Sequence, residues 1–212
     1  GPLLRGLILR QIWTSAIFTA LIAVSVALGV GLIAQERGLR QGTAQAAAKF
    51  DLVIAAPGSG SGKTMISCGL MASFLKRGKK VVSCKCGPDY IDPMFHEQVI
   101  GAPSCNLDPF FTEEETTQYL FCKHAAGHDI SVLEGVMGYY DGLGGISTKG
   151  SAYDLAGMTK TPVLLVVDAK GMSVSALAFI KGYLQYKEDS RIAGVIFNRM
   201  SEMLYREIAP MA

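Results

Sequence analysis

The sequence predicts an α/β fold with a doubly wound parallel sheet of the P-loop NTPase-like type, preceded by an N-terminal transmembrane helix. Residues 52–56 form a short apolar run typical of a strand buried on both faces, and a glycine-rich loop ending in Lys63 and Thr64 follows directly. Further apolar runs then alternate with helical patterns, as parallel strands joined by crossover helices do. Residues 12–34 contain no charged side chain and are long enough to span a bilayer.

The first 50 residues are predicted to form a segment separate from the rest, with its transmembrane helix at residues 12–34. Charged residues flank both ends of the apolar run, so charge does not fix its orientation. A signal peptide is the alternative, but the run is longer than the usual apolar core of such a peptide. A buried soluble helix fits less well because no polar face interrupts the run.

Composition limits the class of protein. The 212 residues suit one α/β domain plus a small additional part, and a net charge of +2 spread along the chain argues against nucleic-acid binding. The five cysteines lack paired C-x-x-C spacing, which favours reduced thiols in a cytosolic fold over disulfides or a zinc ribbon. Cys84 and Cys86 alternate with Lys85, so we expect both to face the same side of a packed sheet rather than to act as a redox pair.

The loop after the first strand is predicted to bind a polyphosphate. Its glycines lack a Cβ, so backbone N–H groups can surround an oxyanion, and the helix that begins near Lys63 points its positive end at the same place. Lys63 would reach the β- and γ-phosphates, and the Thr64 hydroxyl would help to hold Mg²⁺. A flexible Gly/Ser linker is the alternative, but the buried strand and a helical pattern stopping at Gly78 flank the loop. The residues predicted to bind nucleotide here are Gly58, Ser59, Gly60, Ser61, Gly62, Lys63 and Thr64.

The remaining elements are predicted in order along the chain. Strands are expected at residues 81–84, 130–133, 163–167 and 192–197, which gives five strands with the first. Two prolines are taken to exclude regular structure from residues 85–93, and a second glycine-rich loop covers residues 135–145. Helices are expected at residues 94–100, 151–159 and 174–186, and from Thr112, which is predicted to be an N-cap before an acidic first turn.

Three of the predicted strands end in a polar residue, at the sheet edge where open α/β folds bind ligands. Glu134 is the preferred Mg²⁺ ligand, since the glycines after it leave room for phosphate. Asp168 suits either a contact to Mg²⁺-bound water or a structural role. Asn198 suits either the edge of a nucleobase or a turn.

Further charged residues lie on loops at the same edge. Lys85 can neutralise a transferred phosphoryl group, while Asp89, Asp92 and Asp141 can hold Mg²⁺ or accept a proton from an attacking amine, although loop aspartates are also often only solvated. Tyr139 and Tyr140 either cover a flat ligand or pack the loop. The three histidines, at positions 96, 124 and 128, show no metal spacing and are predicted to be surface residues.

Residues 52–211 resemble the N-terminal synthetase domain of cobyrinic acid a,c-diamide synthases. The resemblance rests on three segments: APGSGSGKT at residues 56–64, KCGPDYIDP at residues 85–93 and EGVMGYYDG at residues 134–142. Pro57, which stands where the usual G-x-x-x-x-G-K-[ST] pattern has glycine, fits this family.

The resemblance implies an ATP- and Mg²⁺-dependent ligase that amidates the c and then the a acetate side chain of cobyrinate, or of hydrogenobyrinate, through acyl phosphates. It implies that ammonia comes from a glutaminase domain that residues 51–212 lack, and it allows a homodimer. By the same resemblance, Gly58 to Thr64 bind ATP, with Asn198 near adenine. Thr64 and Glu134 hold Mg²⁺, and Lys63, Lys85, Asp89, Asp92 and Glu134 are catalytic; Tyr90 and Asp141 lie on the corrin side.

The first 50 residues resemble something different, the first membrane helix of ABC exporter permeases of the macrolide-exporter type. The carriers are LRQIWTS at residues 9–15 and ERGLRQGT at residues 36–43. In that family the residues after the helix lie outside the cytoplasm, so we hypothesise a chimera with a cytoplasmic ligase domain that the helix could anchor to a membrane. The alternatives are a dethiobiotin synthetase, a cobyric acid synthase, a ParA/MinD-like ATPase, which would need lysine in place of Gly58, or an inactive permease fragment.

Overall fold

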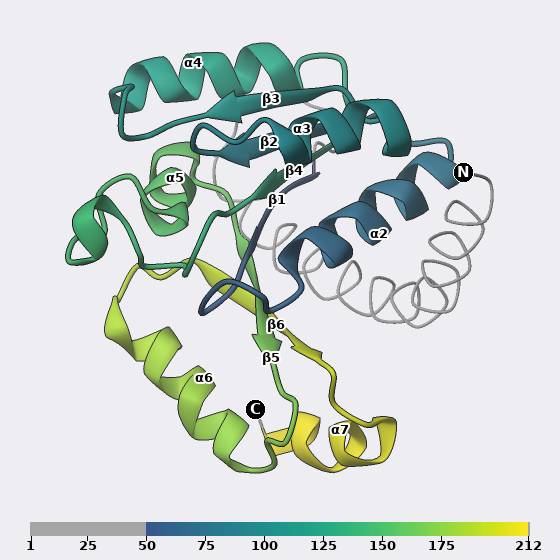
Figure 1. The fold of residues 1–212 in the computed structure, drawn as a ribbon, viewed down its shortest axis with the longest axis vertical. Coiled ribbons are helices and arrows are strands. Elements are labelled where there is room, and N and C mark those ends of the chain that lie inside the picture. Colours follow the sequence, from purple (N-terminus) through teal and green to yellow (C-terminus); the bar gives the residue numbers. More distant parts are fainter. Residues whose placement is uncertain (1–49, 212) are drawn as a thin grey trace, which may run out of the picture.

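The computed structural model describes residues 50–211, which form a six-stranded parallel sheet in the order β3-β2-β4-β1-β5-β6 (Figure 1). Each strand is short, the strands other than β3 are largely apolar, and the chain crosses over between parallel neighbours through helices. The strands are β1 (Phe50–Ala55), β2 (Val81–Cys86), β3 (Ser104–Leu107), β4 (Ile130–Glu134), β5 (Val163–Asp168) and β6 (Ile192–Asn198).

Helices cover both faces of this sheet, as expected for a doubly wound fold, with α2 on one face and α4, α5 and α6 on the other (Figure 1). Two separate apolar clusters result, one on each face. The helices are α2 (Lys63–Lys76), α3 (Ile91–Phe95), the π-helical turn η1 (His96–Ile100), α4 (Glu114–Ala125), the 3₁₀ turn η2 (Leu143–Gly145), α5 (Ala152–Thr159), α6 (Ser175–Tyr186), α7 (Glu202–Ile208) and the 3₁₀ turn η3 (Ala209–Met211).

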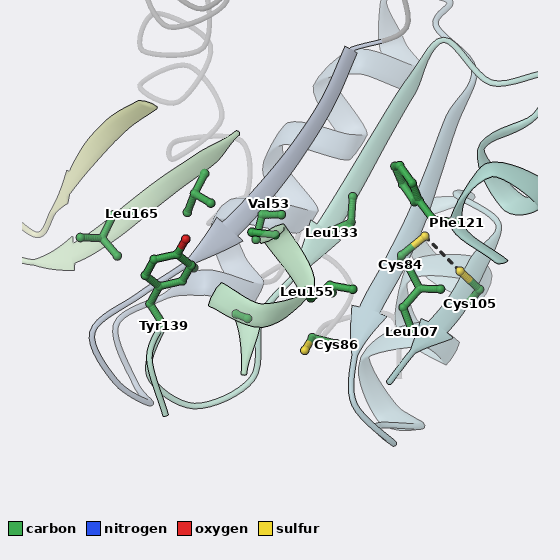
Figure 2. Packing of buried hydrophobic residues seen from close by; sticks show 14 of the residues in the cluster. Val53, Cys84, Cys86, Cys105, Leu107, Phe121, Leu133, Tyr139, Leu155 and Leu165 are labelled. Atoms are coloured by element: carbon green, nitrogen blue, oxygen red, sulfur yellow. Dashed lines mark hydrogen bonds between the residues drawn. The ribbon is translucent and has the colours of Figure 1, made fainter. Parts of the chain in front are cut away.

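Successive side chains of β2 point to opposite faces of the sheet, and both faces are covered. All six residues of β2, apolar and polar, are therefore buried. Cys84 and Cys86 both belong to the cluster on the face of α4, α5 and α6, which confirms that they share one side of the sheet (Figure 2). The sulfur atoms of Cys84 and Cys105 lie 3.0 Å apart in a hydrogen-bonding contact, and this contact and burial raise the pKa of the Cys84 thiol. Ser83 and Lys85 alternate with these cysteines, so they point toward the face of α2.

Strand register places the polar ends of β2 and β4 in one row. Ile54 of β1 pairs with Glu134, and Glu134 pairs with Lys85. Ile54 packs in the cluster beneath α2, so the row faces that helix. The order of strands therefore puts Lys85 and Glu134 next to the start of α2, where the phosphate-binding loop ends.

The elements of the structure differ from the sequence predictions in four places. The structure has a sixth strand, β3, at the sheet edge, and a final helix, α7, which were not predicted. Helix α3 begins at Ile91, within the loop that two prolines were expected to keep irregular; Pro93 is accepted because it lies in the first turn, where no N–H donor is needed. Thr112 is not the N-cap of α4: Glu113 holds that position without a side-chain cap, and Thr112 instead bonds Thr117.

No helix among residues 50–211 is long and apolar enough to cross a membrane. The transmembrane helix predicted at residues 12–34 lies outside the residues that the structure describes.

Shortening Leu133 should destabilise the fold strongly. This fully buried β4 side chain packs against Val53 and Leu155 in the cluster shown in Figure 2, so Leu133→Ala leaves a cavity and should lower the free energy of unfolding by ~3 kcal/mol. Urea denaturation of the full chain measures this. Leu184→Ala on α6, where the side chain is 42% exposed, is the matched control and should change the midpoint little; equal losses in the two variants would contradict the assignment of the core.

Candidate active site

The phosphate-binding loop joins β1 to α2 in the conformation that its glycines allow. Gly60 and Gly62 have positive φ angles of 77° and 97°, and Gly62 directly precedes the first residue of α2. The side chain of Asn198, at the end of β6, donates from Nδ2 to the carbonyl oxygen of Ser61 at 2.8 Å. A Cβ on Gly62 would collide with this amide, so glycine is required both for the φ angle and for the contact.

Lys63, the first residue of α2, lies under the loop. Its ammonium donates to the carbonyl oxygens of Met137 at 2.7 Å and of Gly58 at 3.2 Å. Burial, together with the nearby charge of Lys85, lowers the pKa of Lys63, although Glu134 and Asp141 oppose this shift. A lysine ammonium has three protons, so one remains to reach a phosphate oxygen that the loop holds.

Glu134 is the centre of the site. Its Oε1 accepts from the Thr64 hydroxyl at 2.6 Å and from Lys85 Nζ at 3.0 Å, and only 1% of its side chain is exposed. These two contacts connect the start of α2 to the ends of β2 and β4. Buried carboxylates are normally paired, and here the partner charge is Lys85.

The loop after β2 surrounds Lys85 with acids. Nζ of Lys85 lies 2.5 Å from Asp92 Oδ2 and 3.7 Å from Asp89 Oδ2. Burial alone would lower the pKa of Lys85, but Glu134 and Asp92 outweigh it and raise that pKa, so the ammonium stays charged. Asp89 Oδ1 also accepts from the backbone N–H of Ile91 at 3.0 Å, which fixes the start of α3.

The Lys85–Asp92 pair predicts a pH-dependent stability. Burial alone would raise the pKa of Asp92, but the hydrogen bond and charge of Lys85 dominate and lower it below 3.8. A depressed folded-state pKa gives stability that is present above 3.8 and is lost as pH falls through the folded value.

Asp92→Asn should therefore lower the free energy of unfolding by ~1.5 kcal/mol at pH 7, with the deficit shrinking as pH falls below 3.8. Urea midpoints of the wild type and the variant across this range test it. Glu97→Gln, an exposed substitution nearby, is the control. A deficit that stays constant down to the lowest pH at which both proteins fold would contradict the ion pair.

The two predicted substrate residues, Tyr90 and Asp141, lie on the loops after β2 and β4. Tyr90 is 76% exposed at the start of α3. Asp141 accepts from the backbone N–H of Gly138 at 3.0 Å and lies close enough to Lys63 to affect its pKa. It also borders an open cavity of about 590 Å³ between the loop after β4 and α6. The aromatic residues lining that cavity are Tyr140, Phe179, Tyr183 and Tyr186.

Tyr139 and Tyr140 lie in different surroundings. Tyr139 is fully buried in the core cluster and donates its hydroxyl to the carbonyl oxygen of Ser190 (Figure 2). Tyr140 stacks on Tyr183 and faces the cavity. Tyr183 in turn donates to the carbonyl oxygen of Pro57 at 3.3 Å, which ties α6 to the phosphate-binding loop.

Asp168 is engaged by a residue that the sequence analysis missed. Arg199 binds both carboxylate oxygens of Asp168 and also donates to the carbonyl oxygen of Gly60 at 3.3 Å. The contact with Arg199 supports the structural alternative for Asp168. Because an arginine just after a strand end carries no distinctive motif, only the spatial pairing of β5 with β6 reveals it.

His96 was predicted to be a surface residue, and this is wrong. The side chain is fully buried at the first position of η1, with Nδ1 2.8 Å from Ser83 Oγ and Nε2 3.5 Å from Glu134 Oε2. Burial lowers the pKa of His96, while Glu134 and Asp92 act in the opposite direction. His124 is exposed as expected and His128 is half-buried. A polar strand position such as Ser83, two residues before Lys85, is the one sequence signal that could have indicated a buried partner.

The site fits Mg²⁺ in the way that phosphoryl-transfer enzymes bind it. Within residues 50–211, no three His, Cys, Asp or Glu side chains are grouped to hold a metal ion by themselves. Mg²⁺ usually binds one or two protein oxygens plus phosphates and waters. Thr64 Oγ1 and Glu134 Oε1, which are 2.6 Å apart, supply two hard oxygen atoms next to the phosphate-binding loop.

Comparison with known proteins identifies the family. The family model described as "CobQ/CobB/MinD/ParA nucleotide binding domain" matches residues 52–209, which include every residue of the site. The chain belongs to this family. The match begins at residue 52, so it does not bear on residues 1–50.

Curated relatives of the chain are named a,c-diamide synthases, of cobyrinate or of hydrogenobyrinate. The chain is 46% identical over 151 residues to the cobyrinate a,c-diamide synthase of Listeria innocua, covering 71% of this chain and 33% of the relative. It is 45% identical over 160 residues to the hydrogenobyrinate a,c-diamide synthase of Streptomyces coelicolor, covering 74% of this chain and 33% of the relative. The chain thus spans about a third of the length of the curated relatives it matches.

Solved structures agree on the fold alone. Chloroplast FtsY from Physcomitrella patens superimposes with a TM-score of 0.52 at 16% identity, over 74% of this chain and 52% of that one. The family match and this likeness confirm the predicted α/β parallel sheet of the P-loop NTPase-like type.

Proposed function

We propose that this domain catalyses the ATP- and Mg²⁺-dependent amidation of the a and c side-chain carboxylates of cobyrinate or hydrogenobyrinate in cobalamin biosynthesis. The names of the relatives support the reaction and the substrate class. The observation that carries the proposal is the row of contacts from Thr64 through Glu134 to Lys85 and Asp92. It connects the phosphate-binding loop to a second charged loop, which a nucleotide-binding site alone would not need.

The proposed reaction has two chemical steps. First, an oxygen of the corrin carboxylate attacks the γ-phosphorus of ATP, the bond to the β-phosphate oxygen breaks, and ADP leaves. Then the nitrogen of ammonia attacks the acyl carbon, phosphate leaves with the carboxylate oxygen, and the nitrogen loses a proton. Bound Mg²⁺ would neutralise charge on the phosphates.

Residues of this chain would position the reactants for both steps. Lys63 and the loop amides would hold the phosphates, and Thr64 and Glu134 would hold Mg²⁺. Lys85 lies at the end of β2, held by Glu134 and Asp92, where its charge would stabilise the transferred phosphoryl group. Asp89 lies farther from Lys85, at 3.7 Å, and would accept the proton from the attacking ammonia.

The cavity beside Asp141 suits the corrin side of the substrate. A flat macrocycle presents large apolar faces, and Tyr140 and Tyr186 offer aromatic surface at the cavity wall. Asp141 lies between this cavity and Lys63, which would place a side-chain carboxylate of the corrin near the phosphates. Tyr90, exposed on the loop after β2, would contact the same substrate.

The source of ammonia, the oligomeric state, the location of the protein and the adenine contact remain proposals. Ammonia would be supplied by a glutaminase domain in proteins of the relatives' length, and a homodimer is compatible with the exposed faces. The ligase domain would work in the cytoplasm, and the segment at residues 12–34 would anchor it to a membrane. Asn198, which now holds Ser61, would lie near the adenine.

Incubating the full chain with ATP, Mg²⁺, ammonium and cobyrinate tests the proposal. We expect ADP release that depends on cobyrinate, together with corrin that gains one and then two amide groups by mass spectrometry. ADP release that is the same with and without the corrin, with no amidated product, would contradict amidation and favour a switch ATPase. Dethiobiotin precursor in place of cobyrinate is the control substrate and should give no product.

A further inference from the structure

His96 is a fully buried histidine for which the proposed reaction assigns no role. It is held firmly, because its carbonyl oxygen accepts from the N–H groups of Gly101 at 2.9 Å and Ala102 at 3.0 Å at the end of η1. Its ring lies between Ser83 of β2 and Glu134 of β4, on the face of the sheet that α2 covers. The ring therefore contacts the carboxylate at the centre of the site from the side opposite Thr64.

Two buried atoms face each other across this contact. His96 Nε2 and Glu134 Oε2 are 3.5 Å apart, and neither has a hydrogen-bond partner within the described residues. Buried polar atoms are rarely left unpaired, since an unpaired one costs about 1–3 kcal/mol. The separation is longer than that of an ordinary N–H···O hydrogen bond, so a small shift of either side chain would bring the two atoms within hydrogen-bonding distance.

The contact with Glu134 decides which ring nitrogen carries the proton, because the Ser83 hydroxyl can either donate or accept. If Nδ1 donated to Ser83 Oγ, then the lone pair of Nε2 would face the carboxylate oxygen at 3.5 Å, which is repulsive. If the Ser83 hydroxyl donates to Nδ1 at 2.8 Å, Nε2 carries the proton and points it at Glu134 Oε2. The second arrangement satisfies all four atoms.

Donation from His96 Nε2 to Oε2 would hold the Glu134 carboxylate at both oxygens. The last torsion of a glutamate side chain is soft, so its carboxylate can rotate unless contacts prevent it. With Oε2 bound by His96, Oε1 is the oxygen left facing Thr64 and Lys85. Residues behind a metal ligand orient it in this way and typically change metal affinity by about 10–100-fold.

We propose that His96, held by Ser83, is a positioning residue that fixes the Glu134 carboxylate so that Oε1 is presented to the Mg²⁺ of a bound nucleotide. This inference rests on the proposed function only in taking Thr64 and Glu134 as the Mg²⁺ site. It needs no corrin and no amide transfer, so nucleotide binding alone tests it.

The test measures binding of a fluorescent ATP analogue to the full chain as Mg²⁺ is titrated. His96→Met fills the space but has no donor, and we expect the Mg²⁺ midpoint to rise by about 10-fold. Nucleotide affinity without Mg²⁺ should stay within about twofold of the wild-type value, because no contact among residues 50–211 joins the His96 ring to the phosphate-binding loop or to Lys63.

A second variant and a control accompany this measurement. His96→Gln can place an amide N–H where Nε2 lies and should restore most of the Mg²⁺ affinity. His124→Met, at an exposed histidine, is the matched control.

A purely structural role for His96 would give a different pattern. It would lower the melting temperature and weaken nucleotide binding equally with and without Mg²⁺, and His96→Gln would not rescue it; that result overturns the proposal. An unchanged Mg²⁺ midpoint in His96→Met overturns it too. If His96→Met does not fold, Ser83→Ala, which frees Nδ1, should raise the midpoint by about threefold, and no change there would be equally decisive. If nucleotide binding to the wild type does not depend on Mg²⁺, Thr64 and Glu134 are not the metal site. If binding depends on Mg²⁺ but no amidated corrin forms, only the proposed reaction is contradicted.

Discussion

Replacing Lys63 with methionine should reduce ATP-dependent turnover by about 10³-fold or more while the protein stays folded. The ammonium is the group expected to stabilise charge on the transferred phosphoryl group, whereas its contacts in the fold are two carbonyl oxygens. Methionine keeps most of the aliphatic stem, and the lowered pKa of Lys63 shows that the charge is not favoured by its surroundings. Melting temperature should therefore change little or rise.

ADP release and circular dichroism of the same samples measure these two effects. Lys79→Met, at an exposed lysine after α2, is the control for loss of charge and should keep wild-type turnover. Turnover of Lys63→Met within tenfold of the wild type would remove Lys63 from the chemistry. A large loss of stability would show that the lysine has a structural role instead.

Two substitutions of Glu134 should separate its chemistry from its role in the fold. Glu134→Gln keeps an oxygen acceptor for Thr64 and Lys85 but loses the negative charge, so turnover should fall by about 10²-fold or more with a weaker dependence on Mg²⁺. Glu134→Ala also leaves Lys85, 3% exposed, with one partner fewer in the interior, and should lower the free energy of unfolding by ~3 kcal/mol.

Turnover at several Mg²⁺ concentrations and urea denaturation test this pair of variants. Glu97→Gln on η1 is the matched control, since that carboxylate is exposed. If Glu134→Gln keeps wild-type turnover and Mg²⁺ dependence, the carboxylate is not the metal ligand. If Glu134→Ala is as stable as wild type, the buried row of charges does not contribute to folding as described.

Much of this site was predictable because its residues lie at strand ends or on the loops that follow them. In a parallel sheet, the carboxyl ends of strands meet at one edge, so Lys63, Lys85 and Glu134 could be grouped from local sequence alone. The order of strands, which makes Lys85 and Glu134 direct register partners, was not predictable from spacing. It depends on which strands pair, and that follows from packing of the whole domain.

The parts that sequence reasoning missed share a physical cause. Strand β3 is four residues long, follows Pro103 and alternates polar with apolar residues, so it has no apolar run and its alternation is too short to indicate a strand. His96 was placed on the surface because nothing in its sequence neighbourhood signals burial; the π-helical turn turns it inward. Arg199 supports Asp168 and the loop through a contact between chain segments far apart in sequence.

Transfer of oxygen from substrate to phosphate tests the central claim most directly. Cobyrinate labelled with ¹⁸O in its side-chain carboxylates is incubated with the full chain, ATP, Mg²⁺ and ammonium, and the released phosphate is analysed by mass spectrometry. If the site phosphorylates the carboxylate and an amine then displaces phosphate, each phosphate should carry one labelled oxygen from the corrin. Phosphate that contains no label while ADP accumulates would mean that water attacks ATP directly, and it would contradict the account.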